Sequence, residues 1–325
     1  MSDSGDPDGS DPDGSAPDGD VVPWRAFLAE TVARLEAGGL AISSPVAEAR
    51  WIVEEASGLE GAELELGLDE LATVRGVARL DALVARRLAG EPIQYVLGHW
   101  SFRTLDLLCD RRVLIPRPET EQVVEQALGE LDRLLLARPA GHRATVVDLG
   151  TGSGAMGLSV VAERPGTEVW LVDRSPDALA VARANLAGLG MAGGRVRVVE
   201  GSWFDALPTE LRGRVDLVVT NPPYVAEGEP LDPSVADWEP GDALVSGPRG
   251  LECYEAILAE APTWLAEAGA VLTDDLDMKA ISDPPAAAIA AIMAGCDVLL
   301  LCNNEATQDA VETALRLGEG TVVVA

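Results

Sequence analysis

Residues 215–225 read Val-Asp-Leu-Val-Val-Thr-Asn-Pro-Pro-Tyr-Val, an apolar β-branched run that breaks into two prolines. The run is typical of a strand that is buried on both faces of a parallel sheet. Because successive prolines have a fixed φ and no N–H, the loop is stiff and its carbonyls have few local donors. Asn221 and Tyr224 flank the prolines at the carboxyl end of the strand, where open α/β sheets bind ligands. We therefore interpret residues 221–224 as a binding loop, with a plain proline turn as the alternative.

The composition predicts a globular protein with one large and one small domain. The chain has 325 residues, of which 47% are hydrophobic, and a formal net charge of −30. Such an acidic balance argues against nucleic acid binding through a basic surface. The four cysteines show no CxxC spacing, so we expect them to be reduced and expect no metal site: Cys109, Cys253, Cys296 and Cys302. Because neither a signal peptide nor an apolar run of membrane length is present, we expect a cytoplasmic protein without membrane contact.

Changes in composition divide the chain into four predicted parts. Residues 1–22 repeat Asp-Pro-Asp-Gly, which predicts a disordered acidic leader. Residues 23–90 carry apolar stripes whose helices end near residues 38 and 87, which predicts a helical domain that recognises the substrate. Short apolar runs in residues 91–115 predict a hairpin linker. Residues 116–325 then form the main domain, with a helix from Glu119 to about Leu136.

A glycine loop, Asp148-Leu-Gly-Thr-Gly-Ser-Gly154, follows a predicted buried strand and precedes a helix. Glycines let the backbone approach a ligand closely, and the helix N-terminus offers unpaired N–H groups. The spacing differs from the dinucleotide fingerprint GxGxxG. The next predicted strand ends at Asp173, an acid suited to a ribose diol, and Trp203 and Phe204 are suited to line an adenine pocket. Strands that alternate with helices predict a parallel, doubly wound α/β sheet.

Together, the glycine loop, Asp173 and Asn221–Tyr224 resemble class I S-adenosylmethionine-dependent methyltransferases that methylate planar amide or amine nitrogens. Two further segments are more specific. Val-Leu-Ile-Pro-Arg-Pro-Glu-Thr-Glu at 113–121 and Glu-Pro-x-x-Ala-Leu-x-x-Gly-x-x-Gly-Leu at 239–251 are similar to those of the release factor glutamine methyltransferases, the PrmC/HemK family. The resemblance covers roughly residues 23–272 and includes a helical N-terminal domain.

This resemblance implies a substrate, a cofactor and a set of site residues. The substrate would be the side-chain amide nitrogen of the Gln in the Gly-Gly-Gln motif of class 1 peptide chain release factors. S-adenosyl-L-methionine would be the methyl donor. By the same resemblance, the donor would contact Asp148, Gly150, Thr151, Gly152, Gly154, Asp173, Ser202, Trp203 and Asn221. The substrate would contact Arg117, Glu119, Asn221, Pro222, Pro223 and Tyr224. Asn221, Pro222 and Tyr224 would be the catalytic residues.

Amide chemistry explains why such residues suit this reaction. An amide nitrogen is a poor nucleophile because its lone pair is delocalised into the carbonyl. A site must hold the NH₂ by its two hydrogens, aim the lone pair at the sulfonium methyl, and exclude water. The side-chain oxygen of Asn221 and the carbonyl of Pro222 are suitable acceptors, and Tyr224 can pack over the planar amide. Because the donor is already cationic, neither a metal nor a strong base is required.

The C-terminal part, 273–325, departs from this family. About residues 271–318 resemble a fragment of family 3 glycoside hydrolases of the β-N-acetylhexosaminidase type, with Asp274 at the position of their nucleophile. Their histidine motif, Lys-His-Phe-Pro-Gly-His-Gly, is missing from the chain, and about fifty residues cannot assemble their barrel. We therefore expect no glycosidase activity. Predicted helices at 286–294 and 306–317 alternate here with predicted strands at 296–302 and 321–325. This alternation favours parallel pairing, whereas methyltransferase sheets normally end in an antiparallel strand.

Two alternatives to the leading hypothesis remain. Asn-Pro-Pro-Tyr also serves exocyclic amines, so an N6-adenine or other nucleic acid methyltransferase is one alternative. The acidic charge and the segment 113–121 count against it, and we expect no direct nucleic acid binding. The other alternative is a donor-binding protein that its atypical C-terminus has inactivated.

Overall fold

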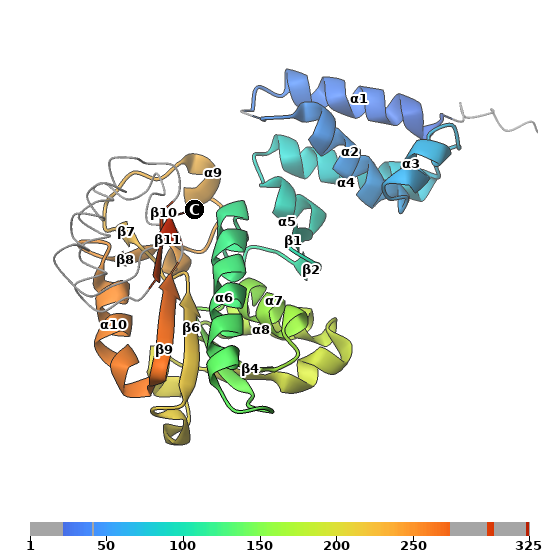
Figure 1. The fold of residues 1–325 in the computed structure, drawn as a ribbon. Coiled ribbons are helices and arrows are strands. Elements are labelled where there is room, and N and C mark those ends of the chain that lie inside the picture. Colours follow the sequence, from blue (N-terminus) through green and yellow to red (C-terminus); the bar gives the residue numbers. More distant parts are fainter. Residues whose placement is uncertain (1–21, 41, 274–297, 302–322, 325) are drawn as a thin grey trace, which may run out of the picture. The chain divides into compact units, whose positions relative to one another are not determined.

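The structure is a computed structural model that describes residues 22–40, 42–273, 298–301 and 323–324 (Figure 1). Contacts within the chain divide it into two compact units, Met1–Gly90 and Glu91–Ala325. The predicted leader, except for its last residue, lies outside the described residues, as does most of the atypical segment 273–325.

The described part of the first unit is helical. Its helices are α1 Trp24–Ala37, α2 Pro45–Ser57, α3 Ala62–Gly67 and α4 Val74–Leu88. Ser44 and Thr73 cap α2 and α4, because their side-chain oxygens accept hydrogen bonds from N–H groups in the first turn. The predicted helix ends near residues 38 and 87 are confirmed, whereas the short helix α3 was not predicted.

The second unit begins with a short helix and a hairpin. Helix α5 spans Ile93–Leu97, and the strands β1 His99–Phe102 and β2 Leu105–Leu108 pair antiparallel, with Phe102 opposite Leu105. Arg103, at the tip of the hairpin, has a backbone φ of 52°, which is uncommon for a residue other than glycine. The sequence thus predicted the hairpin but not the helix before it.

A seven-stranded sheet forms the centre of the second unit, in the order β11-β10-β9-β6-β3-β4-β5. Each neighbouring pair in it is parallel. The strands are β3 Ala144–Leu149, β4 Thr167–Asp173, β5 Val196–Glu200, β6 Val215–Thr220, β9 Leu265–Thr273, β10 Val298–Leu301 and β11 Val323–Val324. The chain order runs outward in both directions from β3 and β6, so the prediction of a parallel, doubly wound sheet is confirmed.

Helices cover both faces of this sheet. Val146, Leu217 and their neighbours pack against α6 Pro118–Ala137 and α7 Ala155–Glu163. The adjacent residues Val147 and Val218 point to the opposite face and pack against α10 Glu252–Trp264. This alternation follows from the two-residue period of a strand. In Figure 1, α6 and α10 accordingly lie on opposite sides of β6 and β9.

Shorter elements complete the second unit. Helix α8 spans Pro176–Ala187, α9 spans Pro233–Ala236, and β7 Val225–Ala226 pairs parallel with β8 Val245–Gly247. The 3₁₀ turns are η1 Gly190–Arg195, η2 Trp203–Ala206, η3 Thr209–Leu211 and η4 Gly241–Ala243.

The C-terminal strands extend the sheet in the parallel sense. Leu272 and Thr273 of β9 pair with β10, and Leu300 and Leu301 of β10 pair with β11. The prediction of parallel pairing is therefore confirmed for the described strands. The helices predicted at 286–294 and 306–317 lie outside the described residues, as does Asp274.

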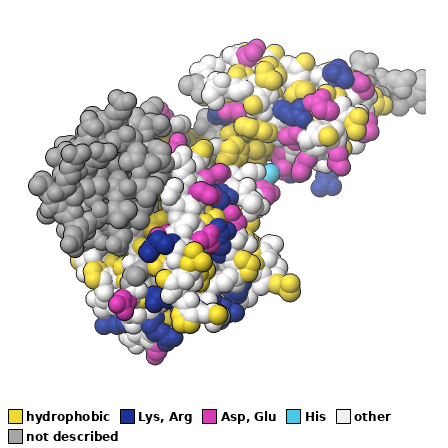
Figure 2. Space-filling model, in the orientation of Figure 1, with side chains coloured by type: hydrophobic (Ala, Val, Ile, Leu, Met, Phe, Trp, Pro, Cys, Tyr) yellow, Lys and Arg dark blue, Asp and Glu magenta, His cyan; other side chains and the backbone are white. Residues whose placement is uncertain are grey.

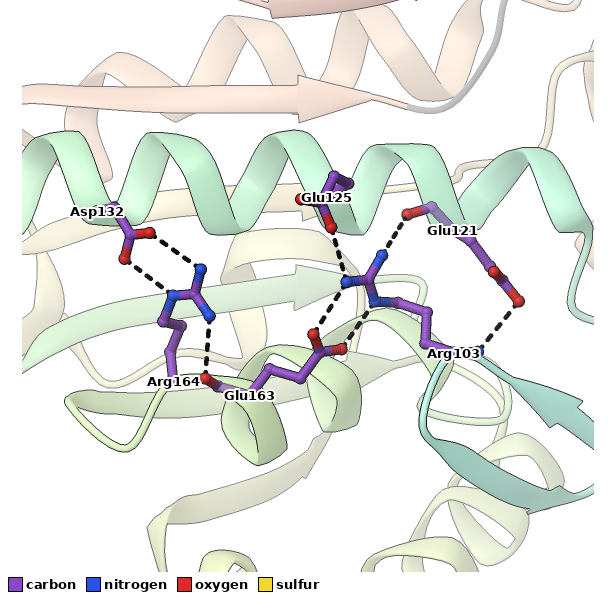
Figure 3. A network of polar contacts seen from close by, with 6 residues as sticks. All are labelled: Arg103, Glu121, Glu125, Asp132, Glu163 and Arg164. Carbon is purple, nitrogen blue, oxygen red and sulfur yellow. Dashed lines mark hydrogen bonds and ion pairs between the residues drawn. The ribbon is translucent and has the colours of Figure 1, made fainter.

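One arginine ties the hairpin tip to two helices (Figure 3). The Arg103 guanidinium donates to the carboxylate of Glu163 on α7 at 2.7 and 2.9 Å and to Glu125 on α6 at 2.8 Å. It also donates to the backbone carbonyl of Glu121. The side-chain carboxylate of Glu121 in turn accepts from the Arg103 backbone N–H. The hydrogen bond with Glu163 raises the pKa of Arg103, and the same bond lowers the pKa of Glu163. Because Arg103 and Glu163 are both largely buried, this bond holds α6 and α7 beside the hairpin.

We expect Arg103→Ala to lower the free energy of unfolding by about 2–4 kcal/mol, because it leaves the largely buried Glu163 carboxylate without its partner. Arg164→Ala is the matched control. Arg164 also joins the end of α7 to α6 through two hydrogen bonds, but its partner Asp132 is 55% exposed, so its loss should change the stability by less than about 1 kcal/mol. Urea unfolding of both variants measures the difference. Equal effects of the two substitutions would contradict this role for Arg103.

Candidate functional site

A cleft lies at the carboxyl ends of β3, β4 and β6. Nine of the residues predicted for the site line it: Arg117, Gly150, Thr151, Gly152, Asp173, Ser202, Trp203, Asn221 and Pro223. Asp148, Gly154, Pro222, Tyr224 and Glu119 are not among the lining residues. The sheet therefore brings most of the predicted residues into one place.

The glycine loop depends on a backbone conformation that other residues rarely adopt. Gly150, Gly152 and Gly154 have φ values of 71°, 56° and 87°. This left-handed region carries a steric penalty for residues with a Cβ. At Gly154, which precedes the first residue of α7, an added Cβ would also lie 2.7 Å from a Leu158 methyl carbon. Gly154 therefore shapes the loop from below rather than lining the cleft.

Asp148 lies beneath the loop and is fully buried. Its Oδ2 accepts hydrogen bonds from the Thr151 hydroxyl at 2.7 Å and from the Gly157 N–H at 2.9 Å. Its Oδ1 is buried and has no hydrogen-bond partner among the described residues. Burial raises the pKa of Asp148 to about 6. Asp148 thus braces the loop with one oxygen and leaves the other for a donor that the described chain does not supply.

Asp173 holds the glycine loop against the start of the next helix. Its Oδ2 accepts from the Gly152 N–H and its Oδ1 accepts from the Ser175 N–H, each at 2.9 Å. Ser175 in turn caps α8 through its side chain. Because a carboxylate oxygen has more than one acceptor site, these bonds leave Asp173 able to accept hydrogen bonds from a ligand in the cleft.

Trp203 forms an aromatic wall of the cleft. Its φ of 44° is in the left-handed region, where a non-glycine residue costs about 1–3 kcal/mol. Its ring packs beside Gly150, where an added Cβ would be 3.5 Å from a ring carbon. Strain of this kind persists only where the surrounding structure imposes it. Phe204, the other aromatic predicted for an adenine pocket, is instead fully buried under the sheet, stacked on Trp264. The prediction was therefore wrong for Phe204.

The Asn221–Tyr224 loop begins where β6 ends beside β3. The Thr220 hydroxyl donates to the carbonyl of Leu149 at 2.8 Å, which joins the two strand ends. The side-chain Oδ1 of Asn221 is buried and has no hydrogen-bond partner among the described residues. Tyr224 is partly buried against the core on the α10 face of the sheet. Its carbonyl would lie 2.5 Å from a Cβ at Gly250, which explains a glycine there in the segment 239–251.

A buried carboxylate that the sequence did not single out as a site residue holds Arg117. The side chain of Glu239 is 1% exposed, and its Oε1 accepts from the Arg117 guanidinium at 2.5 Å. Glu119, on the first turn of α6, is exposed and is not among the lining residues. Of the two residues predicted in the segment 116–121, only Arg117 therefore borders the cleft.

Comparisons with known proteins agree with this geometry. The family model of the PrmC N-terminal domain matches residues 26–98, and that of the methyltransferase small domain matches residues 129–236. The release factor glutamine methyltransferase of Geobacter sulfurreducens is 38% identical over 229 residues, which are 70% of this chain and 75% of that protein. That of Mycolicibacterium smegmatis is 38% identical over 253 residues, 77% of this chain and 84% of that protein.

The chain belongs to the release factor glutamine methyltransferase family. Its fold is that of the class I S-adenosylmethionine-dependent methyltransferases, and S-adenosylmethionine is its methyl donor. The cleft fits this donor, because the wall of Trp203 suits a purine, the Asp173 carboxylate suits a diol, and the unpartnered Oδ1 of Asp148 lies below the loop.

The buried carboxyl of Asp148 should make the free energy of unfolding depend on pH. A native pKa of about 6, raised from 3.8, means that Asp148 stabilises the fold at low pH. That stabilisation is lost as the pH rises to about 6. Asp148→Asn cannot ionise, so its stability relative to the wild type should rise by about 2 kcal/mol between pH 4.5 and 7. Urea unfolding at both pH values, without the donor, measures this change. A difference between the two proteins that does not vary with pH would contradict it.

Proposed function

We propose that the protein transfers a methyl group from S-adenosylmethionine to the side-chain amide nitrogen N5 of the glutamine in the Gly-Gly-Gln motif of class 1 peptide chain release factors. Family membership supports the reaction and the substrate class. One observation of the site carries the proposal: the buried Oδ1 of Asn221 has no partner among the described residues.

An unpartnered buried acceptor costs about 1–3 kcal/mol, so it points to a ligand that supplies the missing donor. A primary amide supplies two N–H donors in one plane. Asn221 would accept one of them and the backbone carbonyl of Pro222 the other, which aims the nitrogen lone pair away from both. The fixed φ of Pro222 and Pro223 keeps this carbonyl in place. Tyr224 would pack over the amide plane and exclude water from it.

The donor would be held by the residues at the ends of β3, β4 and β5. Asp173 would accept from the ribose hydroxyls, and Trp203 with Ser202 would border the adenine. The methionine part would lie along the loop formed by Gly150, Thr151, Gly152 and Gly154, with Asp148 beneath it. Bound there, the donor supplies a sulfonium methyl as the electrophile. The proton that leaves the methylated nitrogen goes to solvent, because the cationic product is a strong acid.

The other parts of the chain would serve this transfer. Residues 23–90 would recognise the release factor, residues 91–115 would link this domain to the methyltransferase domain 116–325, and Arg117 with Glu119 would contact the protein substrate. Among the described helices, none combines the length and apolar character that crossing a membrane requires. On the face drawn in Figure 2, basic and acidic side chains of the second unit are interspersed. The proposed partner is a protein, and we propose that the two meet in the cytoplasm.

We expect Asn221→Ala to lower kcat for release factor methylation by about a hundredfold or more, because it removes an acceptor positioned for the reacting amide. The assay follows labelled methyl transfer from S-adenosylmethionine to a purified class 1 release factor. Calorimetry with the donor should show a far smaller change in Kd than in kcat.

A release factor in which the Gly-Gly-Gln glutamine is replaced by glutamate is the substrate control, since its side chain offers no amide hydrogens. Label on this control, or no label on the unaltered factor while the donor binds, would contradict the proposed function.

A further inference from the structure

Glu239 is the most deeply buried carboxylate beside the cleft that the proposed reaction does not use. Its two oxygens have separate partners: Oε1 accepts from Arg117 Nη2 at 2.5 Å, and Oε2 accepts from the Ile115 N–H at 3.1 Å. Both partners line the cleft, and Glu239 itself does not. It therefore acts behind the wall of the site.

These bonds join two segments that are far apart in sequence. The segment 113–117 precedes α6, and the loop 232–244, which contains α9 and η4, lies between β7 and β8. Pro240, next to Glu239, also lines the cleft. A second contact supports the same junction, because the Arg111 guanidinium lies 4.1 Å from the centre of the Trp238 ring. The positions of Ile115, Arg117 and Pro240, which form this wall of the cleft, thus depend on one buried carboxylate.

The chemistry of Arg117 indicates which reactant this wall faces. The N–H groups of a guanidinium bind peptide carbonyl oxygens well, and because Glu239 already pairs the charge of Arg117, little of that charge is left to attract the carboxylate of the donor. Arg117 has 24% of its side chain exposed, at the border of the cleft. Glu239 neutralises this charge and restricts a long side chain that would otherwise sample many rotamers. Arg117 is therefore suited to the backbone of the protein substrate, in one fixed orientation.

We infer that Glu239 is a positioning residue that acts through Arg117 on the binding of the peptide segment around the reacting glutamine. The inference rests on the proposed function. A carboxylate is required at this position because both groups that face it are N–H donors. Glutamine keeps the size of the side chain but turns one of the two acceptors into a donor, so one of the two bonds is lost.

The test measures methyl transfer to a release factor by the wild type, Glu239→Gln, Arg117→Gln and the double variant. We expect Glu239→Gln to raise KM for the release factor about tenfold or more, with kcat changed less than about threefold. The Kd for S-adenosylmethionine should stay within about twofold of the wild type, as expected for a site not in contact with the donor. In the Arg117→Gln background, Glu239→Gln should have no further effect on KM, because the two residues act as one unit.

Asp237→Asn is the matched control: it removes the same charge two residues away, at an exposed position of the same loop, and should leave KM unchanged. Glu239→Asp keeps both acceptors on a shorter side chain, so its KM for the release factor should lie between those of the wild type and of Arg117→Gln. This variant serves as the test if Glu239→Gln folds poorly.

The outcomes separate this inference from the proposed function. If the wild type methylates the release factor but Glu239→Gln keeps a normal KM, the positioning role is wrong and the function stands. The role is also wrong if the substitution weakens donor binding as much as KM, or if its effect persists undiminished without Arg117. A wild type that binds the donor but labels no release factor overturns both.

Discussion

The parallel pairing of β3 with two neighbours at once is the constraint on which the site depends. Leu149 lies opposite Val172 of β4 and opposite Thr220 of β6, so the three strands end at one level. Gly150, Asp173 and Asn221 then follow within a residue of those positions. A shift of one residue in either pairing would turn the strand faces over and separate these groups. Burial of both faces under α6, α7 and α10 makes that shift costly.

At this edge, the polar atoms fall into two groups. Oδ2 of Asp173 and Oδ2 of Asp148 accept hydrogen bonds from the glycine loop and from α7, and they hold the loop in a left-handed conformation. Oδ1 of Asp173 accepts from Ser175, which caps α8. Oδ1 of Asp148 and Oδ1 of Asn221 are buried without a described partner. Buried polar atoms are nearly always paired, so the second group is informative. The satisfied atoms build the cleft, and the unsatisfied ones point to what it binds.

How far the sequence predicted this structure depended on the range of the interactions. The strands β3, β4 and β6, the glycine turn after β3 and the proline-containing loop after β6 follow from local patterns, and their positions in the chain were predicted correctly. The partner of Arg117 is Glu239, 122 residues away, and no local pattern indicates that pairing. The same reason applies to Arg103, which meets Glu163 from a distance of 60 residues. Trp203 and Phe204 are adjacent and both aromatic, yet Trp203, with its positive φ, lines the cleft and Phe204 is buried in the core, a difference that residue type does not predict.

The C-terminal strands β10 and β11 lie at the edge of the sheet and not at the cleft. The described residues that line the cleft lie between Arg112 and Cys253, before β9 begins. Strand β10 pairs with the last two residues of β9, on the side away from β6. An unpaired edge there would leave backbone N–H and C=O groups without partners, whichever direction the covering strand takes. A parallel strand can satisfy them as an antiparallel one does, so a different C-terminal sequence is compatible with an intact site.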